Sequence, residues 1–157
     1  MKKALLVIGN PLRGDDGVTT FLGHLVEQEN MGWKVFYGQD TPESEFHNLR
    51  EFEPDMIVVA DAMTGLKVGS VEVIDISDER SYMYSTHNLP TPILLSYLKS
   101  FCKGVLFLGL NVDIENVLEI NPGLSNQARQ TALIALEKVI EIDSIFDSKN
   151  TENYIKE

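Results

Sequence analysis

Short apolar runs alternate along the chain with segments whose apolar residues recur at helical spacing. The runs Ala4 to Ile8, Met56 to Ala60 and Gly104 to Gly109 are nearly continuous, which is typical of strands buried on both faces of a sheet. Two shorter runs, Lys34 to Tyr37 and Gly69 to Asp75, indicate further strands. This alternation predicts an α/β fold built on a mostly parallel sheet, with helices between the strands.

Helical spacing marks four segments between and after these strands. One follows Val18, a short one carries Phe46, Leu49 and Phe52, a third opens at Pro92, and Ser125 is placed to cap a final helix. Residues 147–157 are polar, so we expect a frayed tail there. The 157 residues suit one domain, and we assign it to residues 1–146.

Composition and charge exclude several classes of function. A net charge of −11 would repel a phosphate backbone, so nucleic acid is not an expected partner. No stretch approaches the roughly 20 apolar residues that cross a bilayer, so we expect no membrane insertion. The apolar run after Lys3 ends at Gly9 without a cleavage site for a signal peptide, and one cysteine suits a reducing compartment. We therefore expect a cytoplasmic protein.

The loop from Gly9 to Gly17 carries two glycines at P-loop spacing. Asp15 and Asp16 stand where a P-loop has Lys and Ser or Thr, and their carboxylates would repel phosphate, so nucleotide binding is disfavoured. The sequence also lacks the His-Glu-x-x-His helix and the Gly-x-Ser-x-Gly elbow of common hydrolases. Cys102 is expected at the opposite edge of the sheet, as a buried structural thiol.

Three polar residues fall where the carboxyl ends of the strands are expected. Asp16 lies between the first strand and its helix, Asp61 follows the third run, and His87 lies in the long loop before Pro92. Together they could bind a borderline divalent cation such as nickel or zinc. Taken singly, each has an ordinary alternative: a strand-end or capping carboxylate for the aspartates, and a loop histidine for His87.

Three segments in this order resemble the family of hydrogenase maturation endopeptidases, especially the branch that processes formate-hydrogenlyase-type hydrogenases. They are Ile8 to Val18 (IGNPLRGDDGV), Val58 to Ala62 (VVADA) and Ser85 to Pro90 (STHNLP), and similarity covers most of residues 4–140. The resemblance implies a three-layer, phosphorylase/hydrolase-like fold with a twisted five-stranded sheet. It also implies that Asp16, Asp61 and His87 contact the metal and form the catalytic site.

The resemblance further implies the reaction and the partner. The enzyme would be a hydrolase, a peptidase grouped with the aspartic-type endopeptidases, that removes the C-terminal extension of a nickel–iron hydrogenase large-subunit precursor. The cut would fall at a basic residue, after nickel insertion, with the substrate's nickel as recognition element; Zn²⁺ or Cd²⁺ would substitute in vitro. The alternatives are a non-catalytic nickel or metallo-subunit chaperone and a nucleotide-binding domain.

Two segments depart from the family pattern. Tyr37-Gly38-Gln39 stands where many relatives carry Asp-Gly-Gly, and Gly109 to Val112 (GLNV) stands where they carry Gly-Ile-Gln-Pro. The first departure is expected to alter the cleft beside the metal. It bears on the identity of the partner more than on activity, because the three site residues are present.

Overall fold

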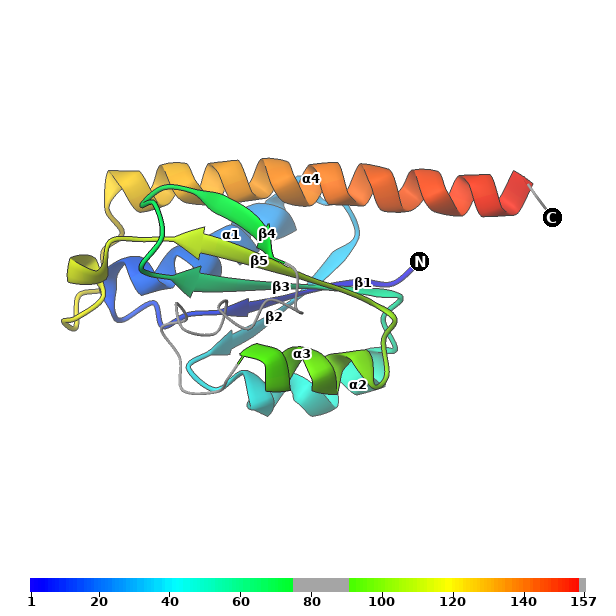
Figure 1. The fold of residues 1–157 in the computed structure, drawn as a ribbon, viewed down its shortest axis with the longest axis horizontal. Coiled ribbons are helices and arrows are strands. Elements are labelled where there is room, and N and C mark those ends of the chain that lie inside the picture. The colour runs from blue at the N-terminus through cyan, green and yellow to red at the C-terminus, as the bar shows by residue number, and fades with distance from the viewer. Residues whose placement is uncertain (75–90, 156–157) are drawn as a thin grey trace.

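A five-stranded sheet forms the centre of the protein (Figure 1). The computed structural model describes residues 1–74 and 91–155, and the side chains of residues 1–73 and 92–146. The strands are β1 (Lys3–Ile8), β2 (Trp33–Gln39), β3 (Met56–Met63), β4 (Val71–Ile74) and β5 (Gly104–Asn111). Their spatial order is β2, β1, β3, β5, β4; the first four in this order are parallel, and β4 runs antiparallel to β5. The predicted α/β class and mostly parallel sheet are confirmed.

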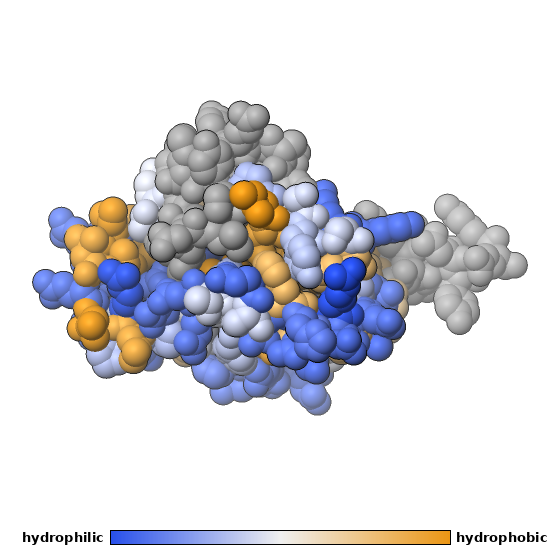
Figure 2. All heavy atoms as spheres, turned by 90° about the horizontal axis from the view of Figure 1, so that it is seen from below, coloured by the Kyte–Doolittle hydropathy of each residue, from blue (hydrophilic) through white to orange (hydrophobic). Residues whose placement is uncertain are grey.

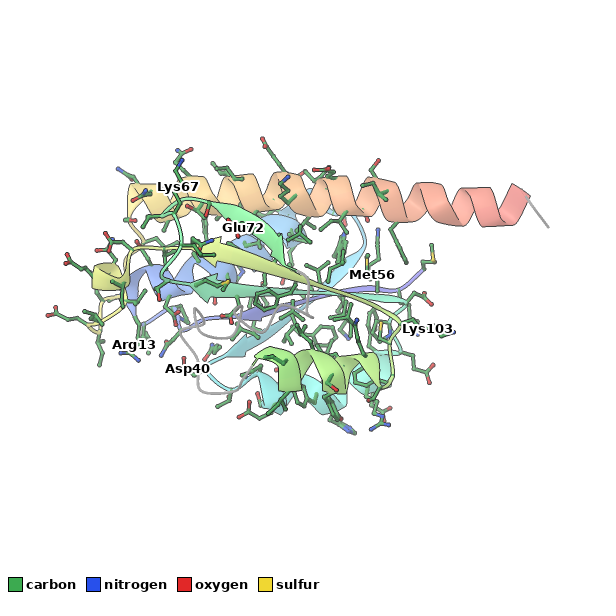
Figure 3. All side chains as sticks on the ribbon, viewed as in Figure 1. Arg13, Asp40, Met56, Lys67, Glu72 and Lys103 are labelled. Atoms are coloured by element: carbon green, nitrogen blue, oxygen red, sulfur yellow. The ribbon has the colours of Figure 1, made fainter. Side chains whose placement is uncertain are left out.

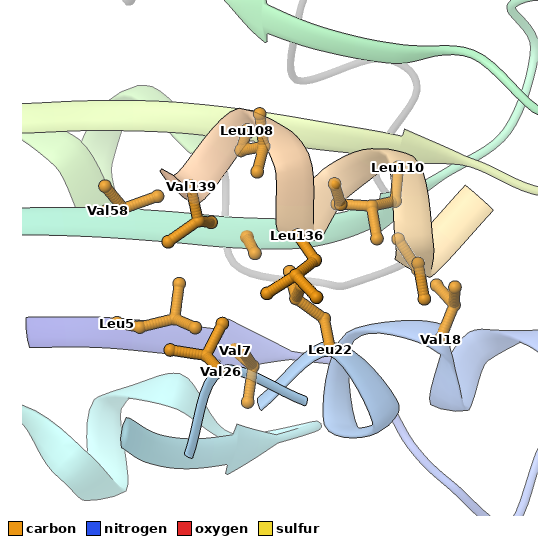
Figure 4. Close-up of a cluster of buried hydrophobic side chains, with 14 of the residues drawn as sticks. Leu5, Val7, Val18, Leu22, Val26, Val58, Leu108, Leu110, Leu136 and Val139 are labelled. Carbon is orange, nitrogen blue, oxygen red and sulfur yellow. The ribbon is translucent and has the colours of Figure 1, made fainter. Parts of the chain in front are cut away.

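Helices cover both faces of this sheet and complete three layers. The helices α1 (Val18–Glu29) and α4 (Asn126–Ile155) lie on one face, and α2 (Phe46–Phe52) and α3 (Thr91–Lys99) lie on the other (Figure 1). Successive residues of a strand point to opposite faces, so Leu5 packs under α1 and α4 while Leu6 packs on the other side. Figure 4 shows how Leu22 of α1 and Leu136 of α4 meet over the strands in the first of these cores.

Strand β3 continues three residues beyond the predicted end at Ala60, to Met63. We expected Asp61 just after this strand, but it lies inside it. Asp61 pairs with Ile8 of β1 on one side and Gly109 of β5 on the other. Because β1 and β5 both extend to this level, the backbone of Asp61 still pairs with them, although Asp61 is polar and the preceding residues of β3 are apolar.

Helix α4 extends further than the sequence analysis placed it. Its backbone continues through Ile155, across most of the segment assigned to a polar tail at residues 147–157. The segment from Asn126 to Ile155 contains neither Gly nor Pro, so nothing in it interrupts helical hydrogen bonding. This last part of α4 extends past the sheet (Figure 1). Within the described residues, no helix combines the length and the apolar character that a membrane span requires.

A polar cluster fastens α4 to the edge of the sheet at which the strands begin. The Lys3 ammonium forms an ion pair with Asp143 of α4 and donates to the Met31 carbonyl over 3.0 Å. The Trp33 indole N–H donates to the same Asp143 carboxylate over 3.1 Å, and the Lys3 ammonium also lies 5.5 Å from the Trp33 ring centroid. This cluster is far from the opposite edge, where the strands end.

Candidate active site

The loop after β1 holds Asp16 in a buried position at the carboxyl edge of the sheet. Asp16 lies in the short 3-10 helix η1 (Gly14–Gly17) and is 3% exposed. Its Oδ2 accepts a hydrogen bond from the Asn10 backbone N–H over 2.7 Å. The Asn10 side-chain amide donates in turn to Asp40 Oδ2 over 2.8 Å. Asn10 therefore joins the acidic residue that follows β1 to the acidic residue that follows β2.

The close approach of this loop to β1 requires glycine at position 9. A Cβ added to Gly9 would lie 2.1 Å from the Asp16 carbonyl oxygen and 2.5 Å from Thr19 Oγ1. The Thr19 hydroxyl donates to the Ile8 carbonyl over 2.8 Å, which fixes the start of α1 against the end of β1. Without a side chain at Gly9, the loop folds back on the strand and brings Asp16 next to it.

Asp61 belongs to the same edge. It is 2% exposed and pairs with Ile8, the residue directly before Gly9. Its side chain leaves β3 on the α2 and α3 face, the face on which Ile57 and Val59 are buried. The structure thus brings Asp16 and Asp61 to neighbouring backbone segments at one edge of the sheet.

The third predicted site residue, His87, lies outside the described residues. Among the residues that the structure does describe, no three His, Cys, Asp or Glu side chains gather in a way that could hold a metal ion. The three-residue metal set therefore stays a prediction. The two carboxylates supply oxygen ligands that a divalent cation accepts, and the chemistry of this donor pair fits such a cation with further ligands from elsewhere.

Asp15 is as buried as Asp16 but has a different role. Its Oδ1 accepts from the Ser125 backbone N–H over 2.8 Å, and its Oδ2 accepts from the Ser125 hydroxyl over 2.7 Å and the Asn116 side-chain amide over 3.1 Å. The Ser125 hydroxyl oxygen also accepts from the Ala128 N–H over 3.1 Å, so Ser125 caps α4 as predicted. Asp15 therefore links the η1 loop to the segment before α4, and both of its carboxylate oxygens accept hydrogen bonds from that segment or from Asn116.

A cavity of about 260 Å³ opens beside Asp16. Its wall is built from the segments that follow all four parallel strands: Arg13, Asp16, Asp40, Thr64, Ile114, Val117 and Leu118. Figure 3 shows Arg13 and Asp40 at the end of the molecule toward which the parallel strands point. The cavity therefore lies where ligands bind in open α/β sheets, outside the carboxyl ends of the strands.

Two polar residues of this region were not singled out from the sequence. Asp40 follows β2 as Asp16 follows β1, and that repeated placement was the available signal. Asn111 ends β5 on the same face as Asp61 and is fully buried, with its Nδ2 donating to the Ser70 carbonyl and to Ser70 Oγ, each over 3.1 Å. Its burial depends on the neighbouring strands, so no local pattern marks it.

The departing segment Tyr37-Gly38-Gln39 lies directly before Asp40, a residue of the cavity wall. The Tyr37 hydroxyl points to α1, where it donates to Glu27 over 2.5 Å and contacts His24 Nδ1 over 3.1 Å. Gln39 adopts a left-handed backbone with φ of 50°, and its carbonyl accepts from the Gly9 N–H over 3.0 Å. A non-glycine residue thus holds the turn that leads into Asp40.

Cys102 lies at the opposite edge, as predicted. It is buried just before Gly104, whose partner in the ladder is Met56 at the beginning of β3, and the thiol donates to the Gly104 carbonyl over 3.6 Å. Burial raises the pKa of the Cys102 thiol. Five residues of strand, about 16 Å, separate this level of the sheet from that of Asp61. Cys102 is therefore no nucleophile for chemistry at Asp16 and Asp61.

The chain is similar to known proteins over most of its length. It is 35% identical over 117 residues to the hydrogenase 3 maturation protease of Escherichia coli K12, a match that covers 73% of this chain and 75% of that protein. Its fold matches the crystal structure of an uncharacterized protein from Wolinella succinogenes with a TM-score of 0.79 at 52% identity, covering 93% of this chain and 99% of that one. It matches the crystal structure of a hydrogenase 3 maturation protease with a TM-score of 0.76 at 27% identity, covering 87% and 88% of the two chains.

No protein-family model matches the sequence. The relationship rests instead on the identity to the Escherichia coli enzyme and on the shared fold, including the five-stranded sheet. The chain therefore belongs to the family of hydrogenase maturation endopeptidases, and it is a processing peptidase.

Proposed function

We propose that this peptidase removes the C-terminal extension of a nickel–iron hydrogenase large-subunit precursor after nickel has been inserted. The substrate's nickel is the recognition element, and Asp16, Asp61 and His87 contact it. The proposed cut lies at a basic residue beyond the last nickel-binding cysteine motif of the precursor. We place the reaction in the cytoplasm, a reducing compartment that suits the single thiol of Cys102.

The observation that supports this proposal most is the placement of two buried carboxylates at one edge of the sheet. Asp16 lies in the loop after β1 and Asp61 lies in β3; both are at least 97% buried, and Ile8 and Gly9 bring their segments together. Burying an ionised carboxylate is costly unless hydrogen bonds or a cation compensate it. Two buried carboxylates at the edge of the sheet where the cavity lies are suited to bind the metal of an incoming substrate.

The same carboxylates can supply the acid–base chemistry of peptide hydrolysis. In the proposed step, Asp16 or Asp61 accepts a proton from water as the water oxygen forms a bond to the carbonyl carbon of the scissile peptide. The carbon–nitrogen bond then breaks, and the proton passes to the leaving amine. Ligation of the substrate's nickel holds the peptide in place for this step and so lowers its entropic cost.

Incubation of the purified enzyme with nickel-loaded and nickel-free precursor tests this function. We expect the loaded precursor to lose its C-terminal extension, measured as a mass difference, and the nickel-free precursor to keep it. An enzyme that trims both at the same rate would refute nickel recognition. A precursor that binds but keeps its full mass would identify a non-catalytic chaperone instead.

Metal binding by the isolated enzyme gives a second test. We expect Ni²⁺, Zn²⁺ or Cd²⁺ to bind with moderate affinity, and His87→Ala to weaken binding most because it removes the only nitrogen ligand. Binding should also weaken below about pH 6, where an ordinary imidazole becomes protonated. Calorimetric titrations that give equal affinities for the wild type and His87→Ala would remove His87 from the site.

A further inference from the structure

Two exposed apolar side chains, Ile114 and Leu118, line the cavity beside Asp16, and two more, Leu12 and Ile120, lie on the segments that adjoin it. The exposed fractions are 58% for Leu12, 54% for Ile114, 61% for Leu118 and 86% for Ile120. We call these four residues the apolar rim. Figure 2 shows hydrophobic surface at the left end of the molecule, the end at which Figure 1 shows the 3-10 helix η4 (Ile114–Asn116). Single exposed apolar residues are common, but a group in and beside a cavity indicates binding.

The two segments that carry the apolar rim are fastened to each other. The Asn121 backbone N–H donates to the Leu12 carbonyl over 2.8 Å, and the Gly14 N–H donates to the Asn121 carbonyl over 2.5 Å. A side chain at Gly14 would meet the Asn116 carbonyl oxygen at 2.1 Å, so the segments are in close contact there too. Asp15 completes the connection through Ser125 and Asn116. These contacts fix the backbone of the two segments that carry the apolar rim, so a ligand does not have to order this backbone when it binds.

The apolar rim is continuous with the proposed catalytic cavity. Ile114 and Leu118 line the same cavity as Asp16 and Asp40. A peptide whose scissile bond reaches Asp16 would lie in a cavity whose wall includes Ile114 and Leu118. Peptide segments next to a cleaved bond commonly gain affinity by burying apolar side chains in such a place.

We propose that the apolar rim binds apolar side chains of the precursor segment next to the scissile bond. This inference rests on the proposed function and names the part of the enzyme that grips the peptide. The net charge of −11 and the two cavity carboxylates disfavour a second copy of this chain or an anionic membrane surface as the occupant. A neutral or cationic polypeptide meets neither obstacle.

A matched pair of double variants tests the rim. Leu118→Gln/Ile120→Gln removes two rim residues, and Leu133→Gln/Ile134→Gln removes the same residue types from the exposed surface of α4, where they are 44% and 42% exposed. Initial cleavage rates of nickel-loaded precursor at several concentrations give kcat and KM for each. We expect the rim variant to raise KM about tenfold, since each buried apolar side chain contributes to affinity, while kcat stays within about twofold. The α4 variant should match the wild type.

The outcomes separate this inference from the proposed function. Wild-type enzyme that cleaves no precursor refutes both. Active wild-type enzyme with an unchanged KM in the folded rim variant, or with the same rise in KM in the α4 variant, refutes the rim alone. Thermal unfolding of each variant establishes that it is folded. A second rim variant, Leu12→Gln, changes the loop after β1 instead of the segment after β5, and it should also raise KM.

Discussion

The Asn10 backbone N–H donates to Asp16 Oδ2 over 2.7 Å, and this bond sets the position of the first catalytic candidate. A backbone donor cannot be removed by mutation of its own side chain, so the carboxylate is held by the main chain of the loop. The Asn10 side chain is then free to reach Asp40. Asn10 therefore donates hydrogen bonds to two carboxylates, those of Asp16 and Asp40.

Asp16→Asn should abolish cleavage and leave the fold intact. The amide oxygen of Asn can still accept from the Asn10 N–H, but the charge needed for metal ligation or proton transfer is lost. We expect a fall in kcat of at least about 100-fold, the usual effect of losing a general acid–base group, and a nearly unchanged Tm. Mass spectrometry of the precursor measures the first quantity and calorimetric unfolding the second. An active Asp16→Asn enzyme would exclude Asp16 from the chemistry.

Gly9→Ala should impair both stability and cleavage. The new methyl group would lie 2.1 Å from the Asp16 carbonyl oxygen, a backbone atom, so the loop must move away from β1. We expect a loss of about 2–3 kcal/mol in the free energy of unfolding, as for other overpacked sites, measured by urea denaturation. Gly123→Ala is the control, because its nearest contact would be the side-chain oxygen of Asn121 at 3.5 Å. Equal stabilities of the two variants would contradict the close approach.

Asp15→Ala should destabilise the protein without removing a catalytic group. It deletes the acceptor of the Ser125 N–H, the Ser125 hydroxyl and the Asn116 amide, and leaves buried donors unsatisfied. We expect a loss of about 2–4 kcal/mol in the free energy of unfolding. Cleavage by the folded fraction at saturating substrate should continue, with a raised KM because the apolar rim is less well held. A folded Asp15→Ala enzyme with no turnover at any substrate concentration would assign Asp15 to the chemistry instead.

Asp143→Ala should be far more destabilising than removal of an exposed acidic residue from the same helix. It removes the ion-pair partner of Lys3, whose side chain is 8% exposed, and the acceptor of the Trp33 N–H. We expect a loss of about 2–4 kcal/mol in the free energy of unfolding. The control is Glu141→Ala, whose ion pair with Lys138 spans 3.7 Å at the surface and should contribute less than about 1 kcal/mol. Chemical denaturation of both variants makes the comparison.

Cys102 should react slowly with thiol reagents in the folded protein. Burial raises the pKa of the thiol, so less thiolate is present at a given pH than for an exposed cysteine, and the reaction rate should rise only at higher pH. Labelling with a chromogenic disulfide at pH 8, in buffer and in denaturant, measures the difference. Cys102→Ala should lower stability and preserve cleavage. Loss of all activity in a folded Cys102→Ala variant would restore the thiol as a candidate nucleophile.

The sequence by itself determined the layers of this fold. Nearly continuous apolar runs such as Met56 to Ala60 mark strands covered on both faces, because no residue of a central strand reaches water. Helical spacing placed α1 and α4, and the order of runs and helices implied a parallel sheet with its loops at one edge. Asp16 and Asp61 were placed at that edge for the same reason. These are properties of local periodicity and chain order.

Tertiary structure alone decided what each polar residue does. Asp15 and Asp16 are adjacent aspartates, yet they have different roles. Asp15 accepts from Ser125, which is 110 residues away in the chain, whereas Asp16 accepts from the nearby Asn10 N–H and lines the cavity. The position of Asp61 inside β3 depends on pairing with strands on both sides. The apolar rim likewise arises only when Leu12 meets the segment of Asn121. These hydrogen-bond partners and cavity walls come from segments far apart in the chain, so local sequence patterns do not predict them.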